Sequence, residues 1–410
     1  MDKTHSWKTK FLTIAVGQAV SLIGSSAVQF ALIWWMSATT GSALLLSVAG
    51  LVAFIPQMVL GPFAGVWIDR CKRKSVVIGA DLAIGAVAAV FAAYFALSGD
   101  PPVWTACVVL GLRAVGSVFH TPAIQALIPL LVPQEELMRA NGWSQFMQSG
   151  AYMLGPALGA LLYSICPMPV LLLTDLLGAV VAAGTVAVVH VDEPGATGAA
   201  MPDFKAEFRE GVEVYRARPA LLYLLMGAGL CMLFFLPLST LFPLMSSTYF
   251  ALNAAHGSAV EIIYAAGMML SALVLGRIRG GNLLKRAWVG LVVLAVATLL
   301  CGVLPNSYGY FWVYAALCAA LGVSSNIYGI PVMAHMQADI PPEKMGRAFS
   351  LLGSVMSLAM PLGLLVAGPC AERWGVHRWF FLSGVAMLVI TLGMQLLRPL
   401  AVRAAKKRAT

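Results

Sequence analysis

Long runs of apolar residues, separated by short polar segments, fill most of the chain. Crossing the hydrocarbon core of a bilayer takes about 20 mostly apolar residues, and twelve runs reach this length. Their centres fall near residues 23, 56, 86, 116, 154, 180, 233, 268, 296, 323, 360 and 387. The pattern therefore predicts an all-α integral membrane protein with twelve transmembrane helices.

Composition supports this pattern. Hydrophobic residues make up 60% of the chain and charged residues 10%, whereas soluble domains are about one half apolar and one quarter charged. The first apolar run continues to about Met36 without a small-residue cleavage site, so we expect a retained span rather than a signal peptide. The chain has no phosphate-binding loop, no H-E-x-x-H, no G-x-S-x-G, and only isolated histidines and cysteines. We therefore expect no enzyme activity, no cofactor and no metal.

The positive charges predict the orientation in the membrane. Of the 26 Lys and Arg residues, 23 fall on the two termini and on alternate connecting segments, and the other three are Arg113, Arg373 and Arg378. Lys and Arg accumulate in cytoplasmic loops, so both termini should be cytoplasmic. The net charge of +9 could also suggest a nucleic-acid partner. In this context the basic tail from Arg403 to Arg408 is better interpreted as a membrane-surface anchor.

The two halves of the sequence resemble each other. A shift of 208 residues places Val132–Ala140 on Ile340–Ala348 and Ser117 on Ser325. We therefore expect two pseudo-symmetric six-helix bundles, residues 1–191 and 220–410, joined by a cytoplasmic linker of residues 192–219. Apolar residues at helical spacing predict a short amphipathic helix in the linker. These residues are Phe204, Phe208, Val212 and Tyr215. We interpret the linker as a tether rather than a regulatory docking site.

A short charged turn lies between the second and third predicted spans. A loop that only sets orientation would explain its basic residues but neither Asp69 nor the glycines before it. The turn resembles the loop between helices 2 and 3 of major facilitator transporters, where a glycine lets two helix ends touch and an Asp-Arg-x-x-Arg cluster locks the cytoplasmic side. The predicted conformational latch consists of Gly61, Gly65, Asp69, Arg70, Arg73, Lys74 and Asp81.

Four ionisable residues lie within apolar runs, namely Arg113, Asp81, Asp175 and Glu261. Asp81 is about two helical turns from the latch and is assigned to it. Arg113 falls near the midplane, where an unpaired cation costs at least about 2.5–3.5 kcal/mol, so it needs partners. Leu112–Gly116 resembles the fourth-helix motif of the same superfamily, whose arginine is implicated in proton coupling. Burial favours the neutral form of a carboxyl group, and we expect Asp175 or Glu261 to carry protons. Structural pairing alone is the alternative.

The fifth predicted span carries closely spaced small residues. Gly155, Pro156 and Gly159 resemble the antiporter motif of helix five in this superfamily, with one extra residue in the first gap. Small residues let helices approach closely, and proline bends the span. The motif favours export, and ordinary tight helix packing is the alternative.

Polar residues at helical spacing predict an internal cavity, because lipid cannot satisfy amide groups. The predicted cavity residues are Gln18, Ser21, Ser25, Gln29, Gln145, Gln148 and Ser354. Hydrogen bonding between helices is the alternative for any one of them. The abundance of methionine, 20 residues in all, suits an adaptable pocket. His120 precedes Thr121-Pro122, and we interpret it as a residue that caps or stabilises a kink.

Four segments resemble the macrolide-efflux (Mef-type) branch of bacterial major facilitator transporters. They are Trp7–Phe11, Gly17–Leu22, Phe119–Ala123 and Phe349–Pro361. The resemblance implies proton-coupled export of macrolide antibiotics across the bacterial cytoplasmic membrane by alternating access. The expected partners are a drug, protons and the lipid bilayer, with no nucleic acid. The protein is expected to be a monomer, and the sequence does not decide whether it also binds an auxiliary ATPase subunit. The alternatives are export of another drug, a lipid or a siderophore, and a non-transporting membrane sensor, which should carry an appended soluble domain.

Overall fold

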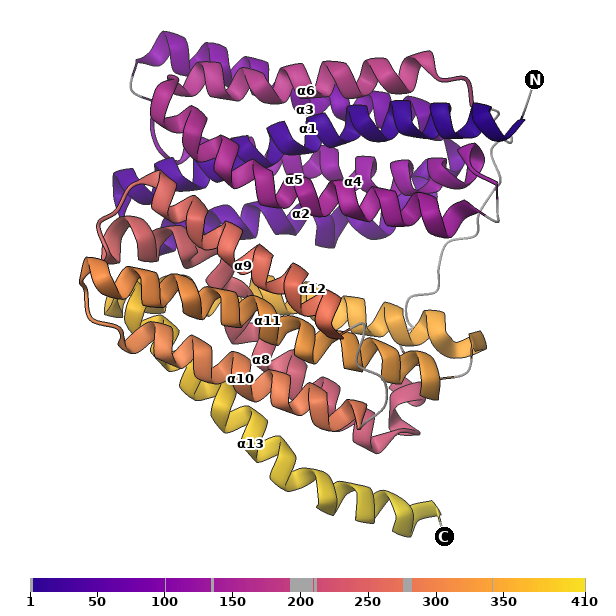
Figure 1. Ribbon diagram of the computed structural model, residues 1–410, viewed down its shortest axis with the longest axis vertical. Coiled ribbons are helices and arrows are strands. Elements are labelled where there is room, and N and C mark those ends of the chain that lie inside the picture. The colour runs from indigo at the N-terminus through magenta and orange to yellow at the C-terminus, as the bar shows by residue number, and fades with distance from the viewer. Residues whose placement is uncertain are drawn as a thin grey trace. The chain divides into compact units, whose positions relative to one another are not determined.

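The computed structural model describes residues 3–99, 101–133, 136–191, 209, 212–275, 282–340 and 342–409. Within these residues the chain forms twelve long α-helices and a five-residue π-helix, η2 (Met245–Tyr249), and no strand (Figure 1). The α-helices are α1 (Lys3–Thr40), α2 (Ala43–Arg70), α3 (Arg73–Ser98), α4 (Thr105–Leu131), α5 (Leu137–Ile165), α6 (Met168–Val188), α8 (Pro219–Leu244), α9 (Ala254–Leu275), α10 (Leu283–Val303), α11 (Tyr308–Asp339), α12 (Pro342–Trp374) and α13 (Val376–Ala409). Every predicted span centre lies inside one of these helices. The predicted all-helical membrane fold is confirmed.

Ten of the described helices are long and apolar enough to cross a membrane. Their apolar spans are 19 to 34 residues long, with mean hydropathy between 1.5 and 2.3. The helices outside this set are α5 and α9. Large apolar side chains point away from the protein interior along the spans, among them Leu97, which is 88% exposed, and Val188, which is 83% exposed. Such exposure suits a hydrocarbon solvent, because lipid tails do not penalise apolar surface.

The chain divides into two compact units. Unit 1 comprises Met1–Gly41, Val48–Met201 and Asn253–Ser258. Unit 2 comprises Ser42–Ser47, Pro202–Leu252 and Ala259–Thr410. The predicted bundle boundaries stay a prediction, because most of the linker lies outside the described residues.

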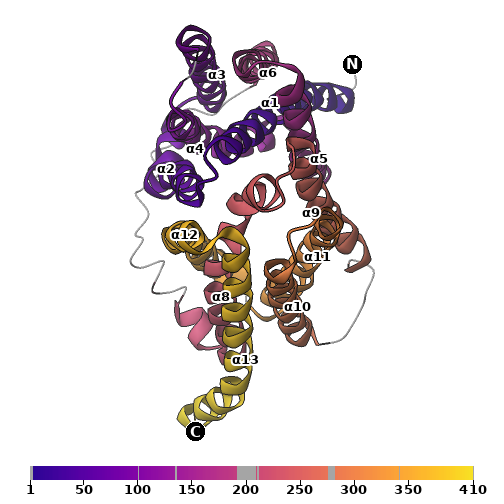
Figure 2. The same cartoon turned by 90° about the vertical axis from the view of Figure 1, so that its left-hand side faces the viewer.

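The same packing order occurs in both units. In unit 1, α1 packs along α5 and α6, and α3 packs along α6 and α4. In unit 2, α8 packs along α12 and α13, and α10 packs along α13 and α11. Figure 2 shows α1 of unit 1 among α4, α5 and α6. The order agrees with the sequence repeat, since corresponding helices take corresponding partners.

Small residues bring α1 close to both of its neighbours. A Cβ added at Gly155 of α5 would overlap Ser26, and one added at Gly178 of α6 would lie 2.9 Å from the Cα of Ser21. Only glycine fits backbones this close. Pro156 follows directly within α5. α1 is thus held between two helices at a distance that packing alone explains.

The end of the linker is fastened to unit 2. Residues 212–216 are helical, and the Tyr215 hydroxyl donates a hydrogen bond of 2.8 Å to the carbonyl of Ala348. The Arg218 guanidinium pairs with the Asp339 carboxylate at 2.9 Å. Phe204 and Phe208, the other two residues of the predicted amphipathic helix, lie outside the described residues.

Candidate functional site

Unit 1 contains a cavity of about 870 Å³, lined by residues of all six of its helices. Ligand pockets of proteins typically have volumes of about 300–1,000 Å³. Five of the predicted cavity residues line it, namely Gln18, Ser21, Ser25, Gln29 and Gln148. The side chains of Gln145 and Ser354 lie outside those that the structure describes. The polar residues of α1 face the cavity because three- and four-residue spacing keeps them on one side of the helix.

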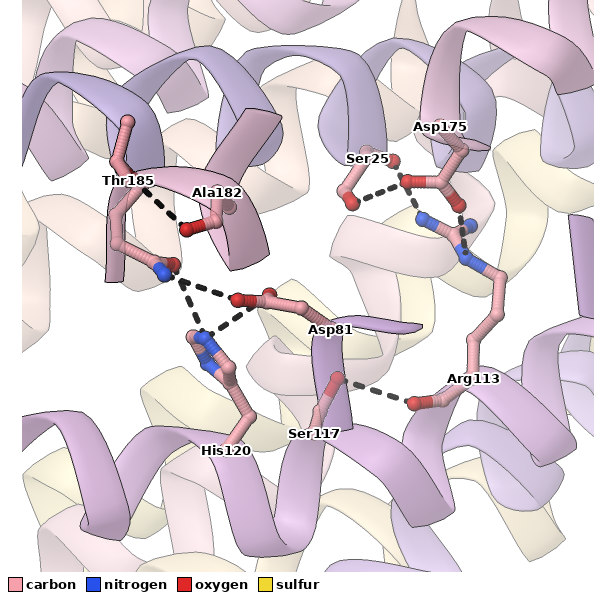
Figure 3. A network of polar contacts seen from close by, with 9 residues as sticks. Ser25, Asp81, Arg113, Ser117, His120, Asp175, Ala182 and Thr185 are labelled. Carbon is pink, nitrogen blue, oxygen red and sulfur yellow. Dashed lines mark hydrogen bonds and ion pairs between the residues drawn. The ribbon is translucent and has the colours of Figure 1, made fainter. Parts of the chain in front are cut away.

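A buried ion pair lies at one end of the polar cluster shown in Figure 3. The Arg113 Nε lies 2.9 Å from the Asp175 Oδ2, and the two side chains are 9% and 0% exposed. The Ser25 hydroxyl donates to the Asp175 Oδ1, and the Arg113 Nη2 donates to the Ser25 carbonyl at 2.9 Å. A buried charge is tolerated only when it is paired and hydrogen-bonded. Arg113, which the sequence showed to need a partner, therefore has one on α6 and another on α1.

A second cluster lies on the same cavity, formed by α1, α3 and α4 (Figure 3). The Gln18 Nε2 donates to the Asp81 Oδ2 at 3.0 Å. The His120 Nε2 lies 3.2 Å from the Asp81 Oδ1 and 3.0 Å from the Gln18 Oε1. Because both of its neighbours accept hydrogen bonds, this ring nitrogen acts as the donor. The three side chains form a closed triangle of polar contacts.

The sequence interpretation gave Asp81 and His120 other roles, in the latch and in helix capping. The structure places both on the cavity wall, in contact with Gln18, and the latch and capping roles stay predictions. The sequence does contain a signal for the contact between Gln18 and Asp81, which is that both residues lie at a similar depth in the membrane. Gln18 and Asp81 each follow a basic segment by seven or eight residues, Lys10 and Lys74 respectively, and a helix rises 1.5 Å per residue. Residues at equal depth in adjacent helices can meet.

Lys74 and Gly61 are predicted latch residues whose surroundings the structure describes. The Lys74 Nζ donates to the carbonyls of Ala187 and Val189, at 2.8 Å each, at the C-terminal end of α6. A cation is favourable at this position, because the helix dipole and the free carbonyls both attract it. Gly61 lies beside the Gln57 side chain.

The rest of the latch has less described detail. The side chains of Asp69 and Arg70, and the surroundings of Gly65, lie outside what the structure describes. The latch as a whole stays a prediction. Its proposed member Asp81 has its described contacts in the cavity cluster.

Glu261 is the other predicted proton carrier. It belongs to α9 in unit 2, is half-buried, and is not among the described residues that line the cavity of unit 1. Arg113 and Asp175 are therefore brought together in unit 1, whereas Glu261 belongs to unit 2.

The antiporter-like motif contacts the cavity helix α1. A Cβ at Gly155 would overlap Ser26, which lines the cavity, and a Cβ at Gly159 would lie 2.6 Å from the carbonyl oxygen of Ala27. These glycines set the distance between α5 and α1. Their contacts support a packing role and leave an effect on transport direction as a prediction.

The ionisable side chains of the cavity can bind a charged ligand or a proton. Among the described residues, no group of three or more His, Cys, Asp or Glu side chains could hold a metal ion. Asp175 is matched by a permanently charged guanidinium, whereas the neighbours of Asp81 are an amide and an imidazole. The cavity thus offers amide and hydroxyl groups, apolar walls and one carboxylate without a fixed counter-ion.

Comparisons with known proteins agree with this architecture. The profile of the Major Facilitator Superfamily matches residues 14–364. The chain is 42% identical over 399 residues to "Macrolide efflux protein A" of Streptococcus pyogenes, covering 96% of each chain. It is 41% identical over 331 residues to a protein of the same name from Enterococcus faecalis, covering 79% of this chain and all of that one.

A solved structure shares the fold. This chain is similar to a bacterial homologue of the human lysosomal transporter Spinster, in an inward-facing and unoccupied conformation, with a TM-score of 0.69 and 14% identity. The match covers 98% of this chain and 99% of that one. At this identity the likeness concerns the fold alone.

Proposed function

Because the chain belongs to the major facilitator superfamily, we propose that it exports macrolide antibiotics from the cytoplasm, in exchange for protons, by alternating access. It is a multi-pass efflux transporter of this superfamily and not an enzyme. The observation that carries the finer proposal is the 42% identity to the streptococcal macrolide efflux protein, which extends over 96% of both chains.

The cavity supports this substrate class. Macrolides are bulky, largely apolar and weakly basic, so their site should be large and mixed in character. The cavity of about 870 Å³ combines apolar side chains such as Phe11, Phe54 and Met147 with amides and hydroxyls. A few placed polar groups within an apolar wall are what orient a ligand in such a site.

The transport cycle follows from two alternately opened arrangements of the helices around a central site. A proton from outside neutralises Asp175 or Glu261, weakens its hold on Arg113 or on a cationic drug, and favours outward release. Moving one charge through the membrane field is worth about 2.3 kcal/mol per 100 mV. Exchange of one proton for one drug cation is therefore electroneutral and driven by the pH difference.

The remaining parts of the proposal concern surroundings and partners. The transporter lies in the cytoplasmic membrane with both termini inside, as its basic residues favour, and the Asp69 cluster holds the cytoplasmic side shut when the site faces out. It acts as a monomer on a small-molecule drug and protons, without nucleic acid.

Accumulation of radiolabelled erythromycin in cells tests the proposal. Cells that express the wild type should accumulate several-fold less drug than empty-vector cells, and a protonophore should abolish the difference. Asp175→Asn and Glu261→Gln test the proton carriers, and His335→Gln, on α11 outside the cavity, is the control that should pump normally. Equal accumulation in wild-type and vector cells would reject the substrate. If both carboxyl variants still pump against a gradient, the proton is carried elsewhere.

A further inference from the structure

Two carboxylates of unit 1 lie in different electrostatic surroundings. Asp175 is fully buried and faces the guanidinium of Arg113. The described partners of Asp81 are the Gln18 amide and the His120 ring. Arginine keeps its charge at every accessible pH, whereas histidine gains or loses a charge between about pH 5 and pH 8. The counter-ion of Asp175 is fixed, and that of Asp81 depends on a proton.

We propose that Asp81 binds the cationic group of the transported drug, and that protonated His120 is the alternative counter-ion of the same carboxylate. The proposal rests on macrolide export and specifies where the positive charge of the drug is held: the drug cation pairs with Asp81 and not with Asp175 or Glu261. Proton and drug then compete for one group at the cavity wall.

The charges that face the site support this assignment. The titratable or charged side chains among the described cavity-lining residues are Asp81, Arg113, His120 and Tyr152. Arg113 is matched by Asp175, which lies behind it on α6, and tyrosine is ordinarily neutral at physiological pH. With neutral His120 the cavity therefore carries one net negative charge, and with protonated His120 it carries none. A cation is attracted in the first state only.

The geometry permits the exchange. Both residues line the cavity, and the side chain of His120 is 19% exposed while that of Asp81 is 4% exposed, so a ligand reaches the carboxylate when it displaces the imidazole ring. Gln18 donates to the Oδ2, while His120 contacts the Oδ1. When the ring turns away, Gln18 still holds the carboxylate in place and the Oδ1 is free for a cation.

The exchange balances in charge and protons. An imidazolium ion releases one proton to water as the ammonium group of the drug takes its place beside Asp81, and no covalent bond of the drug changes. Release of the drug reverses the step, with one proton returning to His120. The site therefore holds one positive charge in either state. Two cations beside one carboxylate would repel each other, which disfavours simultaneous occupancy.

The experiment uses erythromycin methylated at its amino nitrogen, a quaternary ammonium ion whose charge does not change with pH. Its Kd for the purified, full-length protein in detergent is measured at pH 5.5 and pH 8, and proton release is measured with an indicator dye in weak buffer. The wild type should bind at least fivefold more tightly at pH 8, where His120 is neutral, and should release up to one proton per bound cation at pH 5.5, where the ligand-free site is protonated. His120→Gln should remove both effects and keep tight binding at both pH values, because glutamine preserves a neutral donor.

Two further variants complete the test. Asp81→Asn should weaken binding at pH 8 about tenfold, and His335→Gln should behave as the wild type. If His120→Gln keeps the pH dependence and the proton release, or Asp81→Asn binds normally, the assignment is overturned while macrolide binding stands. If the wild type binds neither erythromycin nor the methylated probe, the proposed substrate is wrong and the assignment fails with it.

Discussion

In unit 1 the helix α4 carries two ionisable groups into the interior, whereas the corresponding helix of unit 2, α11, carries neutral side chains at the matching buried positions. The positions that the 208-residue shift pairs with Arg113 and His120 are Leu321 and Tyr328. The helix α13, which packs on α10 as α6 packs on α3, contains no acidic residue. The packing order is nevertheless the same in both units.

This difference separates what the fold needs from what transport needs. Unit 2 forms the same helix pairs without an Arg–Asp pair at these positions, so the charges of unit 1 are not required for the architecture. Ionisable groups within a membrane are costly and are usually kept for function. The comparison therefore predicts that the charge chemistry of transport lies in unit 1, and Glu261, an acid of unit 2, tests this prediction.

The largest expected effect comes from breaking the buried ion pair. Arg113→Ala should abolish erythromycin efflux and destabilise the protein by about 3–5 kcal/mol, because it leaves Asp175 charged, buried and without its cation. Drug accumulation in cells and the apparent melting temperature of the purified protein in detergent measure the two effects.

A double variant sharpens this result. Arg113→Leu combined with Asp175→Leu removes both charges and should recover most of the melting temperature while efflux stays absent. Unit 2 is the natural precedent, because Leu321 is fully buried at the position that matches Arg113. A single Arg113→Ala variant with a normal melting temperature would show that the pair does not matter for the fold at all.

A smaller effect should appear at the glycines that both units share. A Cβ at Gly155 would overlap α1, and a Cβ at Gly363 of α12 would overlap the Leu233 carbonyl of α8. Gly155→Val and Gly363→Val should each cost about 1–3 kcal/mol, because overpacking shifts the backbone. Gly150→Val and Gly353→Val are the controls on the same two helices, since a Cβ at either glycine meets no atom within 4 Å.

These variants also test the antiporter interpretation of α5. Melting temperatures in detergent should fall equally for Gly155→Val and Gly363→Val. If Gly155→Val loses efflux while its melting temperature is unchanged, the motif of α5 has a role beyond packing. That role would then be a second difference between unit 1 and unit 2.

The smallest effect concerns helix ends. Lys74 holds the last carbonyls of α6, and in unit 2 the Asn282 Oδ1 accepts from the backbone N–H of Lys285 at the start of α10. Lys74→Met and Asn282→Ala should each lower stability by about 0.5–1 kcal/mol and change accumulation less than twofold. A loss of efflux in Lys74→Met without a change in melting temperature would instead support its place in the latch.

The fold could be predicted from the sequence because membrane burial imposes a simple rule. Every span must be long and apolar, and twelve such runs could be located before any contact was known. The need of Arg113 for a partner followed from the same physics. The choice of Asp175 as that partner did not, because it depends on which helices are adjacent and how each one is rotated.

The triangle of Gln18, Asp81 and His120 was harder to predict. Each residue had a plausible local explanation, as part of a polar stripe, a latch or a helix kink, and local explanations do not reveal that three helices converge. Burial depth and a shared cavity are properties of the packed bundle. The residues that share one face of a helix could be predicted from their spacing, whereas contacts among three different helices could not.

The position of α1 between α5 and α6 has a mechanical consequence. Gln18 and Ser25 lie seven residues apart, about two helical turns, and touch Asp81 and Asp175 respectively. A rotation or translation of α1 therefore displaces the partners of both acids at once. A change in the contacts of one acid is in this way coupled to the other through a single rigid helix.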